Sequence, residues 1–136
     1  MTKSSAMFEY QVTVRGYEID SYDHLNNAVY LNYVEQARWE ILRESNLVEK
    51  YKASGLLLVV IEANIRFVRE VVVFDELNIK TDITTVGPYV VFQHSMYNSK
   101  TEIKVSEAKV KCLFIGSDRI PVDIPEEFIE FINNHV

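Results

Sequence analysis

The chain has 136 residues, 48% of them hydrophobic and 25% charged, which is typical of one soluble globular domain. Its formal net charge of −6 argues against a nucleic-acid binder, which needs a basic face to meet phosphates. Its single cysteine excludes an intrachain disulfide and is typical of a reducing compartment.

The N-terminal segment is short and polar, and we expect residues 1–6 to be disordered. No long apolar run follows it, so the sequence predicts no signal peptide. The longest apolar run, Leu56–Ile61, is far too short to cross a bilayer. We therefore expect a cytoplasmic protein without a membrane partner.

Two elements open the chain. Apolar and polar residues alternate over 7–15, which predicts a half-buried strand, and a polar loop follows over 16–23. Apolar residues then recur at three- and four-residue steps over 27–44, which predicts a long amphipathic helix. Asn26 or Asn27 is a suitable N-cap. The predicted buried face of this helix consists of Tyr30, Tyr33, Val34, Ala37, Ile41 and Leu42.

Most of the remaining chain alternates as strands do. A short second helix is predicted over 46–52 and a C-terminal helix over 126–134. The apolar phase of the last strand changes along its length, which predicts a β-bulge near Ser106-Glu107. The predicted strands are 56–68, 71–86, 89–98 and 103–115, with turns at Gly87-Pro88 and at 98–100.

The order of these elements limits the fold. One strand and one long helix precede four strands joined largely by tight turns, and tight turns produce antiparallel neighbours. The apolar face of the sheet must be covered, and the long helix is the only element available to cover it. We therefore predict a single α+β domain over residues 1–136, in which a curved antiparallel sheet of about five strands surrounds one central helix. The exposed edges of such a sheet favour dimerisation.

The loop before the long helix contains the residues best suited to chemistry. Asp20 and His24 place a carboxylate and an imidazole directly before a helix N-terminus. Unpaired backbone N–H groups at such an end can bind an anion or polarise a carbonyl. The segment reads Asp20-x-x-x-His24-Leu25-Asn26-Asn27-x-x-Tyr30 and continues with Tyr33, Glu35, Ala37 and Arg38.

This segment resembles the active-site segment of hotdog-fold acyl thioesterases in the 4-hydroxybenzoyl-CoA thioesterase family. The bacterial long-chain acyl-CoA thioesterases are the most similar branch, and plant acyl-ACP thioesterases carry a related segment. The resemblance implies the hotdog fold and hydrolysis of an acyl-CoA to a free carboxylic acid and coenzyme A. It implies no metal or other cofactor, with coenzyme A present only as part of the substrate. It also implies a homodimer or homotetramer whose active sites lie between two subunits.

The resemblance assigns roles to individual residues. Asp20 would be the general base or the nucleophile, and both alternatives stay open. The backbone N–H near Asn27 would polarise the thioester carbonyl. His24 would orient water or the carboxylate, and Glu35 would serve a site shared with a second subunit. The structural alternatives are a hydrogen-bonding role for His24, a capping role for Asn27 and a solvated helix position for Glu35.

A second group of residues is predicted to bind the substrate. An apolar lining formed by Tyr30, Tyr33, Val59, Ile61 and Phe67 would favour an acyl chain, although the same residues would also suit a core. Four basic residues are candidate contacts for the phosphates of coenzyme A, or alternatively a solvated surface. They are Arg66, Arg69, Lys100 and Lys104.

Other chemistries find less support. Cys112 is in phase with Val110 and Phe114, which predicts a buried thiol. His94 and His135 lack the partner spacing of a metal site, and no metal site is predicted. There is no nucleophile elbow, Walker A motif or dinucleotide-binding fingerprint. An acyl-ACP thioesterase, a non-catalytic acyl-CoA-binding protein and a hotdog dehydratase remain the alternatives to an acyl-CoA thioesterase.

Overall fold

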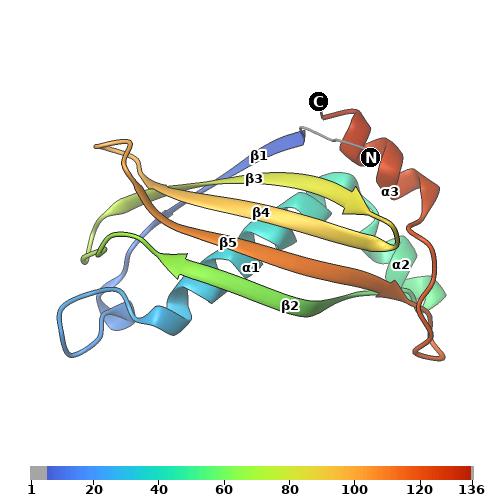
Figure 1. Ribbon diagram of the computed structural model, residues 1–136, viewed down its shortest axis with the longest axis horizontal. Coiled ribbons are helices and arrows are strands. Elements are labelled where there is room, and N and C mark those ends of the chain that lie inside the picture. Colours follow the sequence, from blue (N-terminus) through green and yellow to red (C-terminus); the bar gives the residue numbers. More distant parts are fainter. Residues whose placement is uncertain (1–5, 136) are drawn as a thin grey trace.

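The computed structural model describes residues 6–135 as one curved five-stranded sheet with three helices (Figure 1). The strands lie in the order β1-β3-β4-β5-β2, and every neighbouring pair is antiparallel. The strands are β1 (Ala6–Thr13), β2 (Leu57–Phe67), β3 (Glu76–Val86), β4 (Tyr89–Asn98) and β5 (Lys104–Ile115). The helices are α1 (Asn27–Ser45), α2 (Val48–Ser54) and α3 (Glu126–Asn133), and Gly16–Glu18 forms a single 3₁₀ turn.

The predicted α+β architecture is confirmed. The sheet wraps around α1, and the loop before α1 lies at the opposite end of the sheet from α3 (Figure 1). The predicted disorder of residues 1–6 lies outside the described residues, apart from Ala6, where β1 begins. Among residues 6–135, no helix is long and apolar enough to span a bilayer.

Helix α1 is buried along the predicted face. Five of the six predicted residues are buried, and Leu42 is half-buried. The side chain of Asn26 accepts the Ala28 N–H at 3.0 Å, so Asn26 rather than Asn27 is the N-cap. At the other end Asn46 has a φ of 62° and closes the helix with its N–H on the Arg43 carbonyl.

The sheet departs from the predicted pattern in two strands. Strand β3 begins at Glu76 rather than at residue 71, because residues 71–75 form a turn in which the Asp75 carboxylate accepts the Val72 N–H at 3.0 Å. In β2, Val60 pairs with Cys112 and Glu62 with Lys111, which leaves Ile61 as a bulge. Opposite residues share a face of the sheet, and a bulge reverses the alternation.

The predicted acyl lining was wrong in part, because the bulge in β2 changes which residues face α1. Leu58 lies opposite Phe114 and packs on the core, whereas Val59 lies opposite Leu113 on the other face. Val59 and Ile61 therefore do not belong to the inner face that was predicted for them. The predicted bulge in β5 is confirmed within one residue, since the register against β4 shifts at Val105, just before Ser106.

Candidate active site

The loop that carries Asp20 is closed by backbone hydrogen bonds. The Asp20 N–H donates to the His24 carbonyl at 2.8 Å, and Ile19 and Leu25 form an isolated β-bridge. The Leu25 N–H donates to the Val71 carbonyl at 2.7 Å, which ties the loop to the connection between β2 and β3. These bonds hold the loop beside the N-terminus of α1.

The Asp20 carboxylate is oriented by its own loop. Its Oδ1 atom accepts the backbone N–H of Tyr22 at 2.8 Å and that of His24 at 3.2 Å. Among the described residues both hydrogen bonds to this carboxylate use Oδ1, so Oδ2 is left for water or substrate. A short polar side chain commonly bonds the backbone two residues ahead in this way, which makes the turn locally encoded.

Glu18, which was not among the predicted site residues, anchors the Asp20 loop. Its side chain is only 8% exposed, and it accepts the Tyr33 hydroxyl at 2.5 Å and the Arg15 Nη2 at 2.8 Å. Burial opposes ionisation of Glu18, but the hydrogen bonds from Arg15 and Tyr33 outweigh it and lower the pKa of the carboxyl. The Glu18 carbonyl accepts the Asn26 N–H at 2.9 Å. Glu18 thereby connects the segment that follows β1, helix α1 and the Asp20 loop.

Four of the predicted site residues come together in one cleft of about 220 Å³, between the loop, the start of α1 and the end of β2. Tyr30 is buried, and its ring packs edge to face against that of Phe67, with 4.9 Å between the ring centroids. Burial raises the pKa of Tyr30, and the Asp20 charge adds to this effect. The cleft is lined by Asp20, His24, Leu25, Asn27, Tyr30, Phe67, Val68, Arg69 and Glu70.

His24 has a partner that the sequence did not predict. Its Nε2 atom lies 2.8 Å from a carboxylate oxygen of Glu70, in the connection between β2 and β3. Arg69 lies beside Glu70 and is the one cationic residue among those that line the cleft. The cleft therefore combines two carboxylates, an imidazole and one guanidinium.

The structure places the other three predicted residues elsewhere. Tyr33 is 3% exposed, and its hydroxyl is bound to Glu18 rather than directed at the cleft. Arg66 is exposed on β2, opposite Glu107, whereas its neighbour Arg69 lines the cleft. Glu35 is exposed on α1 and lines a second hollow. Substrate binding by these three residues stays a prediction.

The second hollow is an apolar groove of about 270 Å³ between α1, α2 and β2. Arg38 lies on its wall, and its Nη1 donates to the Val34 carbonyl at 3.3 Å and to the His94 Nε2 at 3.2 Å. His94 is fully buried, and burial together with the Arg38 charge lowers its pKa to about 3. The groove is lined by Glu35, Arg38, Trp39, Leu42, Val48, Tyr51, Lys52, Leu56, Leu57, Leu58, Val60 and Phe114.

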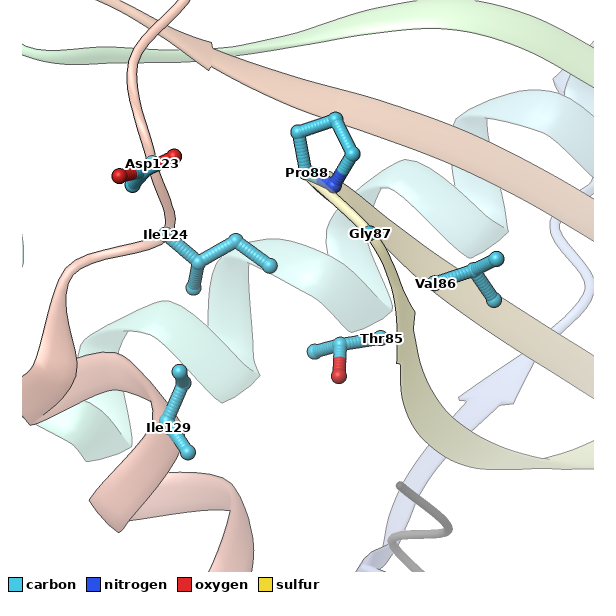
Figure 2. Close-up of a pocket in the computed structure, with 7 residues that line it drawn as sticks. All are labelled: Thr85, Val86, Gly87, Pro88, Asp123, Ile124 and Ile129. Atoms are coloured by element: carbon cyan, nitrogen blue, oxygen red, sulfur yellow. The ribbon is translucent and has the colours of Figure 1, made fainter. Parts of the chain in front are cut away.

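A larger hollow of about 800 Å³ lies at the other end of the sheet (Figure 2). It is formed by the turn between β3 and β4 and by the segment that leads into α3. Asp123 is the one charged residue among the seven that line it, and no predicted site residue is present. Within residues 6–135 no group of three His, Cys, Asp or Glu residues is placed to hold a metal ion.

Several known proteins are similar to this chain in sequence and in fold. Residues 14–132 match the family model of the thioesterase-like superfamily. The long-chain acyl-CoA thioesterase FadM of Escherichia coli is 40% identical over 73 residues, so the match spans 54% of this chain and about half (55%) of that relative. The chloroplastic acyl-acyl carrier protein thioesterase ATL3 of Arabidopsis thaliana is 28% identical over 134 residues, which cover 94% of this chain and 70% of that one.

A solved structure extends the likeness to nearly the whole chain. The probable thioesterase YbaW of Escherichia coli is 28% identical and superposes with a TM-score of 0.84, over 94% of this chain and 98% of that one. The family model and this superposition confirm the resemblance seen in the Asp20 segment. The chain belongs to the thioesterase-like superfamily and has its hotdog fold.

Proposed function

We propose that the protein hydrolyses acyl-CoA thioesters to a free carboxylic acid and coenzyme A. The observation that carries this proposal is the cleft that joins the Asp20 carboxylate to the first turn of α1 at Asn27. The matched relatives support it, because FadM is named as a long-chain acyl-CoA thioesterase. No metal or other cofactor is needed for this chemistry.

The first amide of α1 is suited to polarise the thioester carbonyl. Because the Asn26 side chain takes the Ala28 N–H and the Asn26 carbonyl takes the Val29 N–H, the cap leaves the Asn27 N–H for a ligand. One such donor to a developing oxyanion typically contributes about 3–4 kcal/mol to transition-state stabilisation. The positive end of the helix dipole adds to the effect.

Asp20 supplies the second requirement. As a general base, Oδ2 takes a proton from water while the water oxygen bonds to the thioester carbon, and the C–S bond then breaks to release the thiolate, which is protonated. As a nucleophile, the same oxygen bonds to the carbon, and the C–S bond breaks to release the thiolate, which is protonated. Water then hydrolyses the mixed anhydride, which regenerates the Asp20 carboxyl group and releases the free carboxylic acid. A positioned base contributes about 10² to 10⁴-fold. His24, held by Glu70, orients the water or the carboxylate.

The substrate has room on both sides of this carbonyl. Arg69, at the edge of the cleft, is suited to meet a phosphate of coenzyme A. The acyl chain passes Tyr30 and Phe67 and continues toward the apolar groove between α1 and β2. Leu58 and Val60 line that groove in place of the predicted Val59 and Ile61.

We also propose that two copies assemble through β2, with the cleft completed by the second subunit. Among the described strands β2 pairs only with β5, so the outer side of β2 is unpaired. Large apolar side chains are exposed along this edge and the adjacent face of α1. They are Leu57, Val60, Ile61 and Phe67 on β2, and Leu31 and Trp39 on α1. Those that also line the cleft or the groove would contact both the second copy and an acyl chain that lies between the two subunits. Glu35 also lies on α1, and in such a dimer its carboxylate would reach the active site that the two subunits share.

The experiment is thiol release from acyl-CoAs of graded chain length, with gel filtration of the same sample. We expect an oligomer that turns over acyl-CoA without added metal or other cofactor. We also expect the enzyme to be cytoplasmic. Turnover of acyl carrier protein thioesters with none of acyl-CoAs would favour the activity after which ATL3 is named. Binding of acyl-CoA without thiol release would identify a sensor instead. A folded, fully active monomer would contradict the shared site.

A further inference from the structure

Arg38 is a half-buried cation with no carboxylate within ion-pair distance among the described residues, and the charge of Glu35, one turn earlier on α1, acts on it from further away. None of the ion pairs within residues 6–135 includes it. Its two hydrogen bonds, to the carbonyl of Val34 and the ring of His94, both use Nη1. A guanidinium carries five N–H groups in a fixed fork, so those on Nη2 and Nε remain for another acceptor.

His94 holds this guanidinium in place without neutralising it. Its Nδ1 lies 2.7 Å from the Thr81 hydroxyl, directly across the β3–β4 pair. The ring is stacked on Phe92 and is fully buried, so it is held neutral. A neutral ring that donates through Nδ1 presents Nε2 as an acceptor to Arg38. The positive charge of Arg38 is thereby kept at the wall of the groove.

The groove and the Asp20 cleft lie along one stripe of α1. Asn27, Leu31, Glu35 and Arg38 follow one another at four-, four- and three-residue steps, so they share a helix face. Eleven residues of helix span about 16 Å between Asn27 and Arg38. Tyr30 and Phe67 line the cleft at one end of this stripe, and Leu58 lines the groove at the other.

The charges on the groove favour an anionic group. Three charged residues line it, namely Arg38, Lys52 and Glu35, so the local balance is positive in a protein of net charge −6. Glu35 is exposed and its charge acts on Arg38, but it forms an ion pair with neither cation among the described residues, whereas Arg38 is half-buried among apolar side chains. A ligand that fills the groove removes the exposed part of the Arg38 guanidinium from water, which is costly unless the ligand pairs with the charge. The complementary ligand is an apolar chain that ends in a carboxylate.

We propose that Arg38 binds the terminal carboxylate of an ω-carboxyacyl thioester whose carbonyl lies at Asn27 and whose chain follows this stripe of α1. The inference rests on the proposed thioesterase function and names its substrate class, the mono-CoA thioesters of α,ω-dicarboxylic acids. Arg38 is a specificity determinant here and takes no part in bond cleavage.

The test compares matched substrate pairs of graded length, each an ω-carboxyacyl-CoA and the monocarboxylic acyl-CoA with the same number of carbons. At the chain length that fits best, we expect the wild-type KM to be about tenfold lower for the ω-carboxy member of the pair. A tenfold change corresponds to the free energy that one charge-assisted hydrogen bond contributes. In Arg38→Met the ratio of the two KM values should approach one, and Arg38→Lys should retain part of the preference. Arg43→Met removes an exposed charge from the same helix, where Arg43 pairs with Glu40, and should keep the wild-type ratio.

Because each ratio is taken within one protein, a partly unfolded variant does not imitate the result. The inference is overturned if the wild type shows no preference at any length, or if Arg38→Met keeps the wild-type ratio. Calorimetric binding of both ligands to the Asp20→Asn protein separates the two proposals. Suppose that the wild type released thiol from no acyl-CoA, while the Asp20→Asn protein bound the ω-carboxy ligand about tenfold more tightly than the matched monocarboxylic ligand. The thioesterase proposal alone would then fail. If plain acyl-CoAs turned over without any ω-carboxy preference, the Arg38 proposal alone would fail.

Discussion

Replacing Tyr33 by Phe tests the anchor beneath the Asp20 loop. The Tyr33 hydroxyl donates to the Glu18 carboxylate at 2.5 Å, and the two residues are only 3% and 8% exposed. A hydrogen bond to a charged group contributes about 1.5–3 kcal/mol to stability, and here its loss leaves a buried acceptor short of one partner. We therefore expect Tyr33→Phe to lower the free energy of unfolding by about 1.5–3 kcal/mol.

The assay is urea unfolding, followed at two pH values. Tyr17→Phe is the matched control, because Tyr17 is 83% exposed and its hydroxyl loss should change stability by less than about 0.5 kcal/mol. The folded protein lowers the pKa of Glu18 below its ordinary value of 4.5. The Tyr33 contribution should thus be complete above pH 4.5 and should fade as the pH falls through the lower, folded-state pKa.

Two results would contradict the role assigned to the Tyr33 hydroxyl. One is a Tyr33→Phe protein as stable as the Tyr17→Phe control at neutral pH. The other is a destabilisation that stays constant when the pH falls far below 4.5, since a bond to an ionised Glu18 cannot persist there. Thiol release by Tyr33→Phe should also fall, because Glu18 supports the loop that orients Asp20.

Three further predictions concern single residues. Asn26→Ala should destabilise the protein by about 0.5–2 kcal/mol in urea unfolding, because it removes the N-cap of α1, whereas Asn27→Ala should not; equal losses would contradict the cap assignment. Burial and the Arg38 charge hold the pKa of His94 at about 3 instead of 6.5. Between these two pH values the unfolded chain binds a proton at His94 that the folded protein does not bind. The free energy of unfolding should therefore fall by up to about 1.4 kcal/mol per pH unit as the pH falls from 6.5 toward 3. His94→Gln should lack this part of the pH dependence, and an unchanged slope would argue against a neutral His94. Burial raises the pKa of Cys112 to about 11, so a thiol reagent should label it at neutral pH only after denaturant is added; fast labelling of the folded protein would show that the thiol is accessible.

Local patterns were sufficient to predict most of the fold. The three- and four-residue spacing over 27–44 identified the buried face of α1, and the phase change in the last strand located its bulge within one residue. The interruption at residues 71–75 was missed, because Val71–Val73 are suited to a strand. The turn there depends on the Asp75 side chain and on Phe74 at a φ of 71°.

The predicted inner face of β2 failed for a different reason. Apolar residues occur on both sides of the bulge at Ile61, so alternation alone cannot show which of Val59 and Val60 turns toward the helix. The strand also lies at an edge of the sheet, where fewer neighbours bury it. Edge position follows from the strand order, which no local pattern contains.

The candidate site was predicted in part. Asp20, His24, Asn27 and Tyr30 are close in sequence, and the structure brings them to one cleft. The partners that come from distant segments were missed, such as Glu70 for His24. The pair formed by Thr81 and His94 could have been predicted. The turn at Gly87-Pro88 fixes the β3–β4 register, and this register places Thr81 opposite His94.

The proposed role of Asp20 is tested by measuring thiol release by the Asp20→Asn protein. The substituted amide oxygen can still accept the N–H groups of Tyr22 and His24, so the loop should keep its shape while the base or nucleophile is lost. We predict a fall in kcat of at least about 10²-fold with the wild-type unfolding curve retained. If Asp20→Asn turned over acyl-CoA at the wild-type rate, the carboxylate beside the start of α1 would not be the group that drives thioester cleavage.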